Sequence, residues 1–89
     1  MKLLWSSGAW EDYLYWQRTD QKVMLAINEL IKDIRRDPFK GLGKPEPLKH
    51  DLQGWWSRRI TRGDRLVYRV TGRNESHQLE ILQCRYHYE

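Results

Sequence analysis

The 89-residue chain is long enough for one compact domain, and its hydrophobic share of 39%, with five Trp and five Tyr, is enough to fold it. Its one cysteine, Cys84, excludes an internal disulfide, and the apolar run at residues 3–5 is too short for a signal peptide or membrane span. The net charge of +4 is concentrated in residues 32–69, where eleven Lys or Arg outnumber five Asp or Glu. We therefore expect a single cytoplasmic domain over residues 1–89 that binds a polyanion or an acidic protein, not a membrane.

The N-terminal part predicts a strand and a first helix. Residues 3–5 are a short strand candidate, and Ser6 or Ser7 is suited to cap the following helix by accepting a backbone N–H bond. The helix is expected to run to about Arg18 with a wide, aromatic apolar face. The residues assigned to that face are Trp10, Tyr13, Leu14 and Gln17, with Ala9 and Trp16 beside them.

A second helix is predicted up to about Asp37, because Pro38 disfavours helical geometry in the residue before it. Its apolar residues recur at the spacing of one helix face, which indicates a side that faces the core. The link to the first helix is short, so we expect an antiparallel helical hairpin. The apolar residues of this face are Val23, Ile27, Leu30, Ile31 and Ile34.

Residues 37–54 are predicted to form a long structured loop, since they hold all three prolines and three of the six glycines. Loops longer than about 12 to 15 residues are uncommon in compact domains and are often functional. Glu46 lies between Pro45 and Pro47, whose fixed backbone angles restrict the direction of its carboxylate. The residues expected to pin the loop to the body of the domain are Leu42, Leu48 and Leu52.

The C-terminal part predicts an antiparallel run of strands. Residues 55–60 and 65–70 alternate in side-chain direction around a three-residue turn. If Ile60 faces Leu66 across the turn, the side of the sheet that buries both must face the helices. The opposite side then carries a row of guanidinium groups, from Arg59, Arg65 and Arg69.

A final strand over residues 79–84 completes an order that indicates an α+β fold. We expect an N-terminal strand and an antiparallel helical hairpin packed on one face of a twisted, mainly antiparallel sheet, in the order β-α-α-β-β-β-β. Several separated blocks of this sequence resemble the YoeB branch of the RelE-type toxins. The blocks are KPEPLKH at 44–50, WSRRIT at 56–61, RLVY at 65–68 and CRYHY at 84–88, with similar stretches at 13–16 and 27–32.

The resemblance implies a ribosome-dependent endonuclease that cuts messenger RNA in the ribosomal A site without a metal or another cofactor. It implies attack of a ribose 2'-hydroxyl on the adjacent phosphate, which needs a base, an acid and positive charge around the phosphorane. By the same resemblance Glu46 is the base, His87 the acid and Arg65 the phosphate clamp. The further site residues that it implies are Tyr88, which positions phosphate or base near the acid, and Lys49 and Arg59, which bind RNA electrostatically.

The resemblance also implies partners for the chain. An acidic, partly disordered YefM-like antitoxin would fold onto the basic cleft and occupy the phosphate site or shift the C-terminal residues. A toxin homodimer is implied as well, and so is binding of promoter DNA through the antitoxin only.

Other interpretations of the same residues stay open. Glu46 also fits a solvated carboxylate, and Arg59 and Arg65 fit ordinary surface arginines. Cys84 and His87 form the one close pair of zinc ligands, which is too few for a structural zinc site, so Cys84 is expected to be a small buried hydrophobe. Two other side-chain assignments are made: Tyr86 is expected to pack, and Glu89 to raise the pKa of the His87 imidazole.

Two other classes of function fit the sequence. A non-catalytic RNA- or ribosome-binding module would grip phosphates with the basic face and stack bases on Trp55 or Trp56, which otherwise belong to the core. An antitoxin-binding protein without nuclease activity would use the same basic face for an acidic partner.

Overall fold

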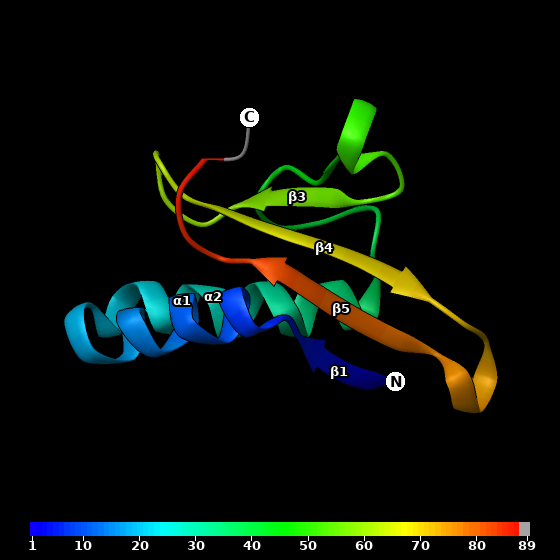
Figure 1. The fold of residues 1–89 in the computed structure, drawn as a ribbon, viewed down its shortest axis with the longest axis horizontal. Coiled ribbons are helices and arrows are strands. Elements are labelled where there is room, and N and C mark those ends of the chain that lie inside the picture. The colour runs from blue at the N-terminus through cyan, green and yellow to red at the C-terminus, as the bar shows by residue number, and fades with distance from the viewer. Residues whose placement is uncertain (88–89) are drawn as a thin grey trace.

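A five-stranded sheet packs against two helices in the computed structural model of the chain, which describes residues 1–87 (Figure 1). The sheet order is β1-β5-β4-β3-β2, with β1 parallel to β5 and the other pairs antiparallel, which confirms the predicted α+β fold. Within residues 1–87 no helix is long and apolar enough to cross a membrane. The elements are β1 (Lys2–Trp5), α1 (Ser7–Thr19), α2 (Gln21–Arg36), β2 (Glu46–Pro47), the short 3-10 helix η1 (His50–Leu52), β3 (Trp56–Arg59), β4 (Arg65–Thr71), the short 3-10 helix η2 (Asn74–Ser76) and β5 (Gln78–Gln83).

Asp20 is the one residue between α1 and α2, and it satisfies open backbone groups of both. Its N–H donates to the Trp16 carbonyl oxygen (2.9 Å), and its carboxylate accepts from the N–H groups of Lys22 (3.1 Å) and Val23 (3.3 Å). This compact link turns the chain back on itself, as the sequence predicts. The five apolar residues predicted for α2 are all buried, and they form the core with residues of β4 and β5.

The buried face of α1 differs from the predicted one. Ala9 is fully buried, and Tyr13 and Trp16 pack against the core, so the buried face follows the helical period from Ala9. Trp10, which the sequence assigns to this face, is 45% exposed and stacks on Tyr13 with ring centroids 5.9 Å apart. The small Ala9 side chain lets the helix approach the end of β5, where the Cys84 thiol donates to the Ala9 carbonyl oxygen (3.5 Å).

The β3–β4 hairpin has the predicted arginine face but a different register. Arg58 lies opposite Leu66, so the predicted pairing of Ile60 with Leu66 is wrong and the loop covers residues 60–64. The carbonyl oxygen of Asp64 accepts the Ile60 N–H (3.0 Å) and closes this wider loop. Because Arg58 and Ile60 are two positions apart, the shift leaves every side chain on its predicted side. The arginines that project away from the helices are Arg59, Arg65 and Arg69.

Arg58 points to the helix side and is fully buried. Its Nε donates to the Tyr68 hydroxyl (3.1 Å), and Nη1 donates to a carboxylate oxygen of Asp33 (2.5 Å). A buried charge is tolerated when it is paired and hydrogen-bonded, and this guanidinium meets that condition by binding α2 and the loop after it. The loop carbonyl oxygens that accept from it are those of Asp37 (2.7 Å), Lys40 (3.1 Å) and Leu42 (3.1 Å).

The leucines predicted to pin the loop do so unequally. Leu48 is buried and Leu52 is half-buried, whereas the Leu42 side chain is 54% exposed. The backbone of Leu42 holds this part of the loop instead, because its N–H donates to Asp33 (2.9 Å) and its carbonyl oxygen accepts from Arg58. The buried charge thus replaces the predicted apolar anchor.

Replacing Arg58 with methionine is expected to lower the free energy of unfolding by about 3 to 5 kcal/mol. The Asp33 carboxylate and the loop carbonyl groups would lose the guanidinium that donates to them. Urea denaturation followed by tryptophan fluorescence measures the change. The matched control is Arg62→Met in the exposed hairpin loop, for which a change within about 0.5 kcal/mol is expected. Equal urea midpoints for the two variants would contradict the expected contribution of the buried Arg58–Asp33 pair to stability.

Stability in acid is expected to depend on Asp33. The side chain of Arg36, the Leu42 N–H and the side chain of Arg58 hold the pKa of the Asp33 carboxyl well below its usual range. Its contribution is therefore complete above the ordinary carboxyl pKa of about 3.9 and is lost as the pH falls towards its value in the folded protein. Asp33→Asn should flatten the decline of the urea midpoint between about pH 4 and pH 2, whereas Asp51→Asn should leave it unchanged.

Candidate active site

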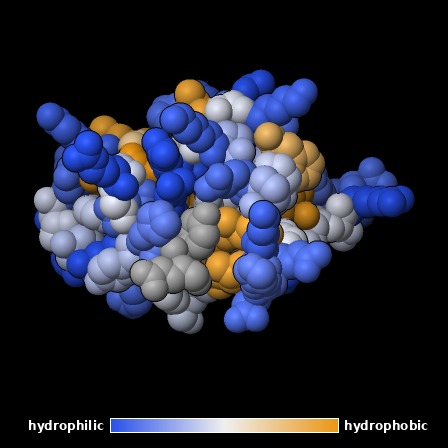
Figure 2. Space-filling view, turned by 90° about the horizontal axis from the view of Figure 1, so that it is seen from above, coloured by the Kyte–Doolittle hydropathy of each residue, from blue (hydrophilic) through white to orange (hydrophobic). Residues whose placement is uncertain are grey.

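The side of the sheet away from the helices carries the loop with η1 and the C-terminal end of the described chain (Figure 1). Figure 2 looks onto this side, where hydrophilic side chains predominate and several smaller hydrophobic areas lie between them. Val67 points to this side, opposite to Leu66 and Tyr68, and is nevertheless buried. The segments above the sheet therefore cover part of this face and leave the rest accessible.

Glu46 and Arg65 meet on this face. The Nη1 atom of Arg65 lies 3.7 Å from Oε1 of Glu46, and the Arg65 side chain is 11% exposed. Within residues 1–87 the buried Arg65 Nε–H has no hydrogen-bond partner, and neither has the hydroxyl of Ser57, which lies opposite Glu46 in the sheet. Unpaired buried donors are rare because each costs free energy. Among the described residues, Arg65 Nε and Ser57 Oγ are thus two unsatisfied polar atoms beneath the part of this face where Glu46 lies.

The backbone before Glu46 is held close to β3. The Gly43 carbonyl oxygen accepts the Arg59 N–H (2.7 Å). Gly43 has a φ of +77°, and a Cβ there would lie 2.9 Å from the Arg59 carbonyl oxygen, so this approach requires glycine. Glu46 then pairs with Ser57 in the β2–β3 ladder. These contacts fix the start of the strand that carries the Glu46 carboxylate.

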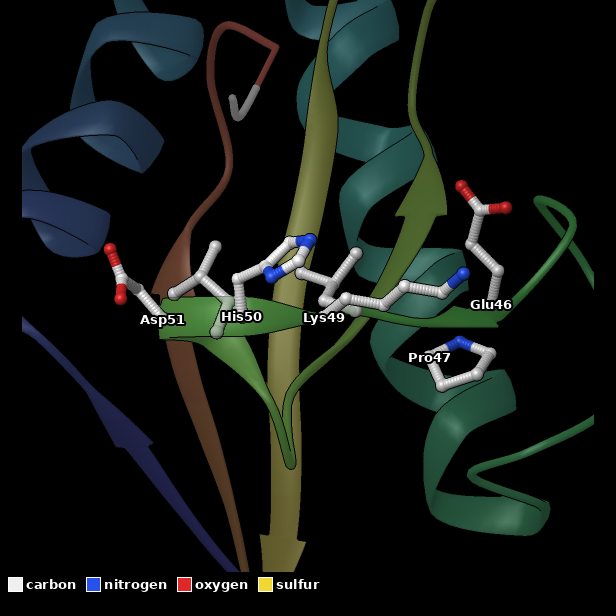
Figure 3. A pocket seen from close by; sticks show the side chains of 7 residues that line it. Glu46, Pro47, Lys49, His50 and Asp51 are labelled. Atoms are coloured by element: carbon white, nitrogen blue, oxygen red, sulfur yellow. The ribbon is translucent and has the colours of Figure 1, made fainter.

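Residues 46–52 line a cavity of about 410 Å³. In Figure 3 the Lys49 side chain extends towards Glu46. Asp51 lies at the other end of the row of labelled residues. Lys49 and His50 are exposed. The two predicted residues of this loop, Glu46 and Lys49, therefore share one cavity.

Residues 84–87 form a C-terminal arm whose root is bound to α1. The Cys84 N–H donates to a carboxylate oxygen of Asp12 (3.0 Å), and the Cys84 carbonyl oxygen accepts from Trp16 Nε1 (2.8 Å). Sequence reasoning assigns no such role to Asp12 or Trp16. The sequence signal that could have indicated the role of Asp12 is its carboxylate beside the apolar face of a predicted helix.

The arm brings His87 to the same face as Arg65. The Arg65 N–H donates to the Tyr86 carbonyl oxygen (3.0 Å), and the Tyr86 N–H donates to a carboxylate oxygen of Asp64 (2.7 Å). His87, which is exposed, follows directly on the residue that these bonds hold. Tyr86 itself is 60% exposed, so the prediction that its ring packs is wrong.

Backbone strain is concentrated around these residues. Within residues 1–87 four non-glycine residues have a positive φ, a conformation that L side chains rarely adopt. One of them lies in η2, and each of the other three lies within two residues of a predicted site residue. These three are Lys44 (53°), His50 (58°) and Tyr86 (67°), beside Glu46, Lys49 and His87 respectively.

The remaining predicted residues divide between the site and other contacts. Arg59 lies opposite Arg65 in the ladder and is exposed on the same face. Arg69 pairs with Glu80 (3.2 Å), and its guanidinium lies 4.3 Å from the centre of the Trp55 ring. Arg69 is therefore paired with an acidic side chain and packed on an aromatic ring. The predictions for Tyr88 and Glu89 lie outside the described residues.

Burial shifts two titratable groups at the root of the arm. It raises the pKa of the Asp12 carboxyl, against the lowering effects of the Cys84 N–H and Arg85. Burial, with the negative charges of Asp12 and Asp64, raises the pKa of the Cys84 thiol to about 12. Cys84 is thus a neutral buried side chain at neutral pH, as predicted. Within residues 1–87 no three His, Cys, Asp or Glu side chains gather closely enough to hold a metal ion.

Comparison with known proteins gives a consistent set of relatives. The model of the YoeB-like toxin of bacterial type II toxin-antitoxin systems matches residues 5–88. Toxin YoeB of Escherichia coli K12 is 62% identical over 88 residues, which are 99% of this chain and 100% of that protein. The structure of the YoeB/ParE toxin from Agrobacterium tumefaciens has a TM-score of 0.96 at 56% identity and covers 99% of this chain and 100% of its own.

Structures from Staphylococcus aureus are similar over the same length. One is a YoeB dimer with a TM-score of 0.86, and another is a YoeB-YefM complex with a TM-score of 0.87. Each is 43% identical to this chain and covers 99% of it and 98% of the matched chain.

The Cys84 thiol is expected to resist modification in the folded protein. At pH 8 its reaction with dithionitrobenzoate should be at least about 100-fold slower than in guanidinium chloride, because burial removes both access and the thiolate form. The absorbance of the released thionitrobenzoate follows the reaction, and the unfolded chain serves as the control. Similar rates in the two conditions would show that the root of the arm opens readily.

Proposed function

Because this chain belongs to the YoeB-like toxins of bacterial type II toxin-antitoxin systems, we propose that it is a ribosome-dependent endoribonuclease that cleaves messenger RNA in the ribosomal A site. The observation that carries the proposal is the contact of Glu46 with Arg65 on a basic face to which the arm brings His87. A base, an anion-binding group and a proton donor are the parts that cyclising cleavage of RNA needs.

In the proposed reaction, Glu46 accepts the proton of a ribose 2'-hydroxyl as that oxygen attacks the adjacent phosphorus. The bond between phosphorus and the 5'-oxygen breaks, and His87 gives its proton to the departing oxygen. The products are a 2',3'-cyclic phosphate and a 5'-hydroxyl. Because a 2'-hydroxyl is required, the substrate is RNA and not DNA.

Positive charge in the proposed site stabilises the negative charge of the phosphorane. Arg65 binds a phosphate oxygen through its guanidinium group, whose Nη1 atom lies 3.7 Å from Oε1 of Glu46. Lys49 and Arg59 are exposed on the same face and hold the flanking RNA backbone. Tyr88, outside the described residues, completes the proposed set by positioning phosphate or base near His87.

The proposed partners follow from the same charge distribution and from the relatives. An acidic YefM-like antitoxin would cover the basic face, a role supported by the Staphylococcus aureus YoeB-YefM complex. A homodimer is supported by the YoeB dimer of that organism. We further propose that promoter DNA is bound through the antitoxin only, and that the toxin acts in the cytoplasm, where it meets ribosomes and messenger RNA.

A non-catalytic module that binds RNA or the ribosome is the second candidate function. The exposed Tyr86 ring beside a basic face favours it, since aromatic rings stack on bases without cleaving the chain. The two candidates differ in the fate of the messenger RNA, which is intact after binding and cut after catalysis.

Cleavage can be tested with messenger RNA on translating ribosomes. The wild-type protein is expected to produce cuts that primer extension maps, with 2',3'-cyclic phosphate at the new 3' ends. Glu46→Gln and His87→Ala should each slow the cleavage by about 100-fold to 10000-fold, because each removes a proton-transfer group, while ribosome binding persists.

Lys22→Ala is the matched control, because it removes an exposed positive charge from α2, on the other side of the sheet. It should leave the cleavage rate unchanged. Ribosome binding by the wild-type protein without any cut in the messenger RNA would contradict the nuclease and establish the binding module.

A further inference from the structure

The loop at residues 60–64 holds the arm through one side chain. The Oδ1 atom of Asp64 accepts the Tyr86 N–H (2.7 Å), and its Oδ2 accepts the Thr61 hydroxyl (2.7 Å). The next residue, Arg65, donates its N–H to the Tyr86 carbonyl oxygen (3.0 Å). Both backbone polar groups of Tyr86 are therefore bonded to consecutive residues, the last of the loop and the first of β4.

Tyr86 depends on these bonds because its backbone is strained. Its φ of +67° is one that non-glycine residues keep when the surroundings hold them there. The ring is 60% exposed, so the core does not fix it, and the Arg85 guanidinium lies 4.5 Å from the ring centre. The hydrogen bond that Asp64 accepts from Tyr86 and the one that Arg65 donates to it thus set the bend that precedes His87.

The root of the arm is attached independently of this bend. Asp12 and Trp16 bind both backbone polar groups of Cys84, and the Arg85 guanidinium lies 3.4 Å from the centre of the Tyr15 ring. Loss of the Asp64 carboxylate would leave these contacts with α1 in place. The bend at the next residue would relax, and the side chain after it would lose its direction.

We propose that Asp64 is a positioning residue that holds the His87 imidazole over the linkage whose phosphate Arg65 binds. The inference rests on the function proposed above and extends it to a residue outside the predicted site. Asp64 acts as a hydrogen-bond acceptor for the Tyr86 N–H. Asparagine, whose side-chain oxygen also accepts, can therefore replace it, whereas alanine cannot.

The test uses two messenger RNAs that differ in one atom at the mapped cleavage site. Each is placed on translating ribosomes. One carries the ordinary bridging 5'-oxygen, and the other carries sulfur in that position. A thiolate leaves without a proton, so cleavage of the second RNA does not need the acid. Single-turnover rates at saturating enzyme report the chemical step and exclude differences in binding.

Asp64→Ala is expected to cleave the ordinary RNA about 100-fold more slowly than wild type, because a displaced acid costs about that factor. It should cleave the sulfur-bearing RNA within about threefold of wild type, as His87→Ala should, whereas Glu46→Gln should be slow on both. Asp64→Asn should restore cleavage of the ordinary RNA to within about threefold of wild type.

Asp20→Ala is the matched control, since it also removes an aspartate whose carboxylate accepts backbone N–H bonds, here those of Lys22 and Val23 at the start of α2. It should leave the ratio of the two rates unchanged. The inference is overturned if Asp64→Ala is equally slow on both RNAs, equals wild type on the ordinary RNA, or shares its ratio with Asp20→Ala. If the wild-type protein cleaves neither RNA, the proposed function fails first.

Discussion

A buried positive charge on one side of the sheet sets the position of the proposed site on the other side. Arg58 cannot lose its partners without leaving a desolvated guanidinium unpaired, so α2 and the loop after it are bound to β3. The loop then passes Gly43, whose carbonyl oxygen is bonded to the backbone of Arg59, the residue after Arg58. Glu46 follows three positions later on the accessible face. The position of the Glu46 carboxylate therefore depends on the Arg58 guanidinium on the opposite side of the sheet.

Features that depend on a repeating period could be predicted from the sequence. The buried side of α2 follows from the helical period, and the arginine face follows from the alternation of a strand. Alternation tolerates an error of register, as the hairpin shows. The pairing of Ile60 with Leu66 is wrong, yet a shift of two residues keeps Arg59 and Arg65 on the predicted side.

Features that depend on single contacts between distant segments could not be predicted in this way. An arginine at an inward position, such as Arg58, has no periodic signal that identifies Asp33 as its partner. The carboxylates of Asp64 and Asp12 accept backbone N–H groups of the arm that are 22 and 72 residues away. The sequence shows that each carboxylate can accept a hydrogen bond, but it does not identify the donor. The grouping of Glu46, Arg65 and His87 came from the family resemblance, and the roles of these residues remain predictions.

The parts of the proposed site also differ in how firmly the fold holds them. The arginines stand on strands backed by the core, which suits a group that must meet charge without moving. Glu46 stands on the two-residue strand β2 and His87 on the arm, each within two residues of a backbone position with positive φ. Both segments are tied to the β3–β4 hairpin by backbone bonds such as that from Arg65 to Tyr86. Breaking those ties leaves the helices and the core in place. The proposed proton transfer would therefore be lost by small displacements of two segments, while the domain stays folded and its basic face stays intact.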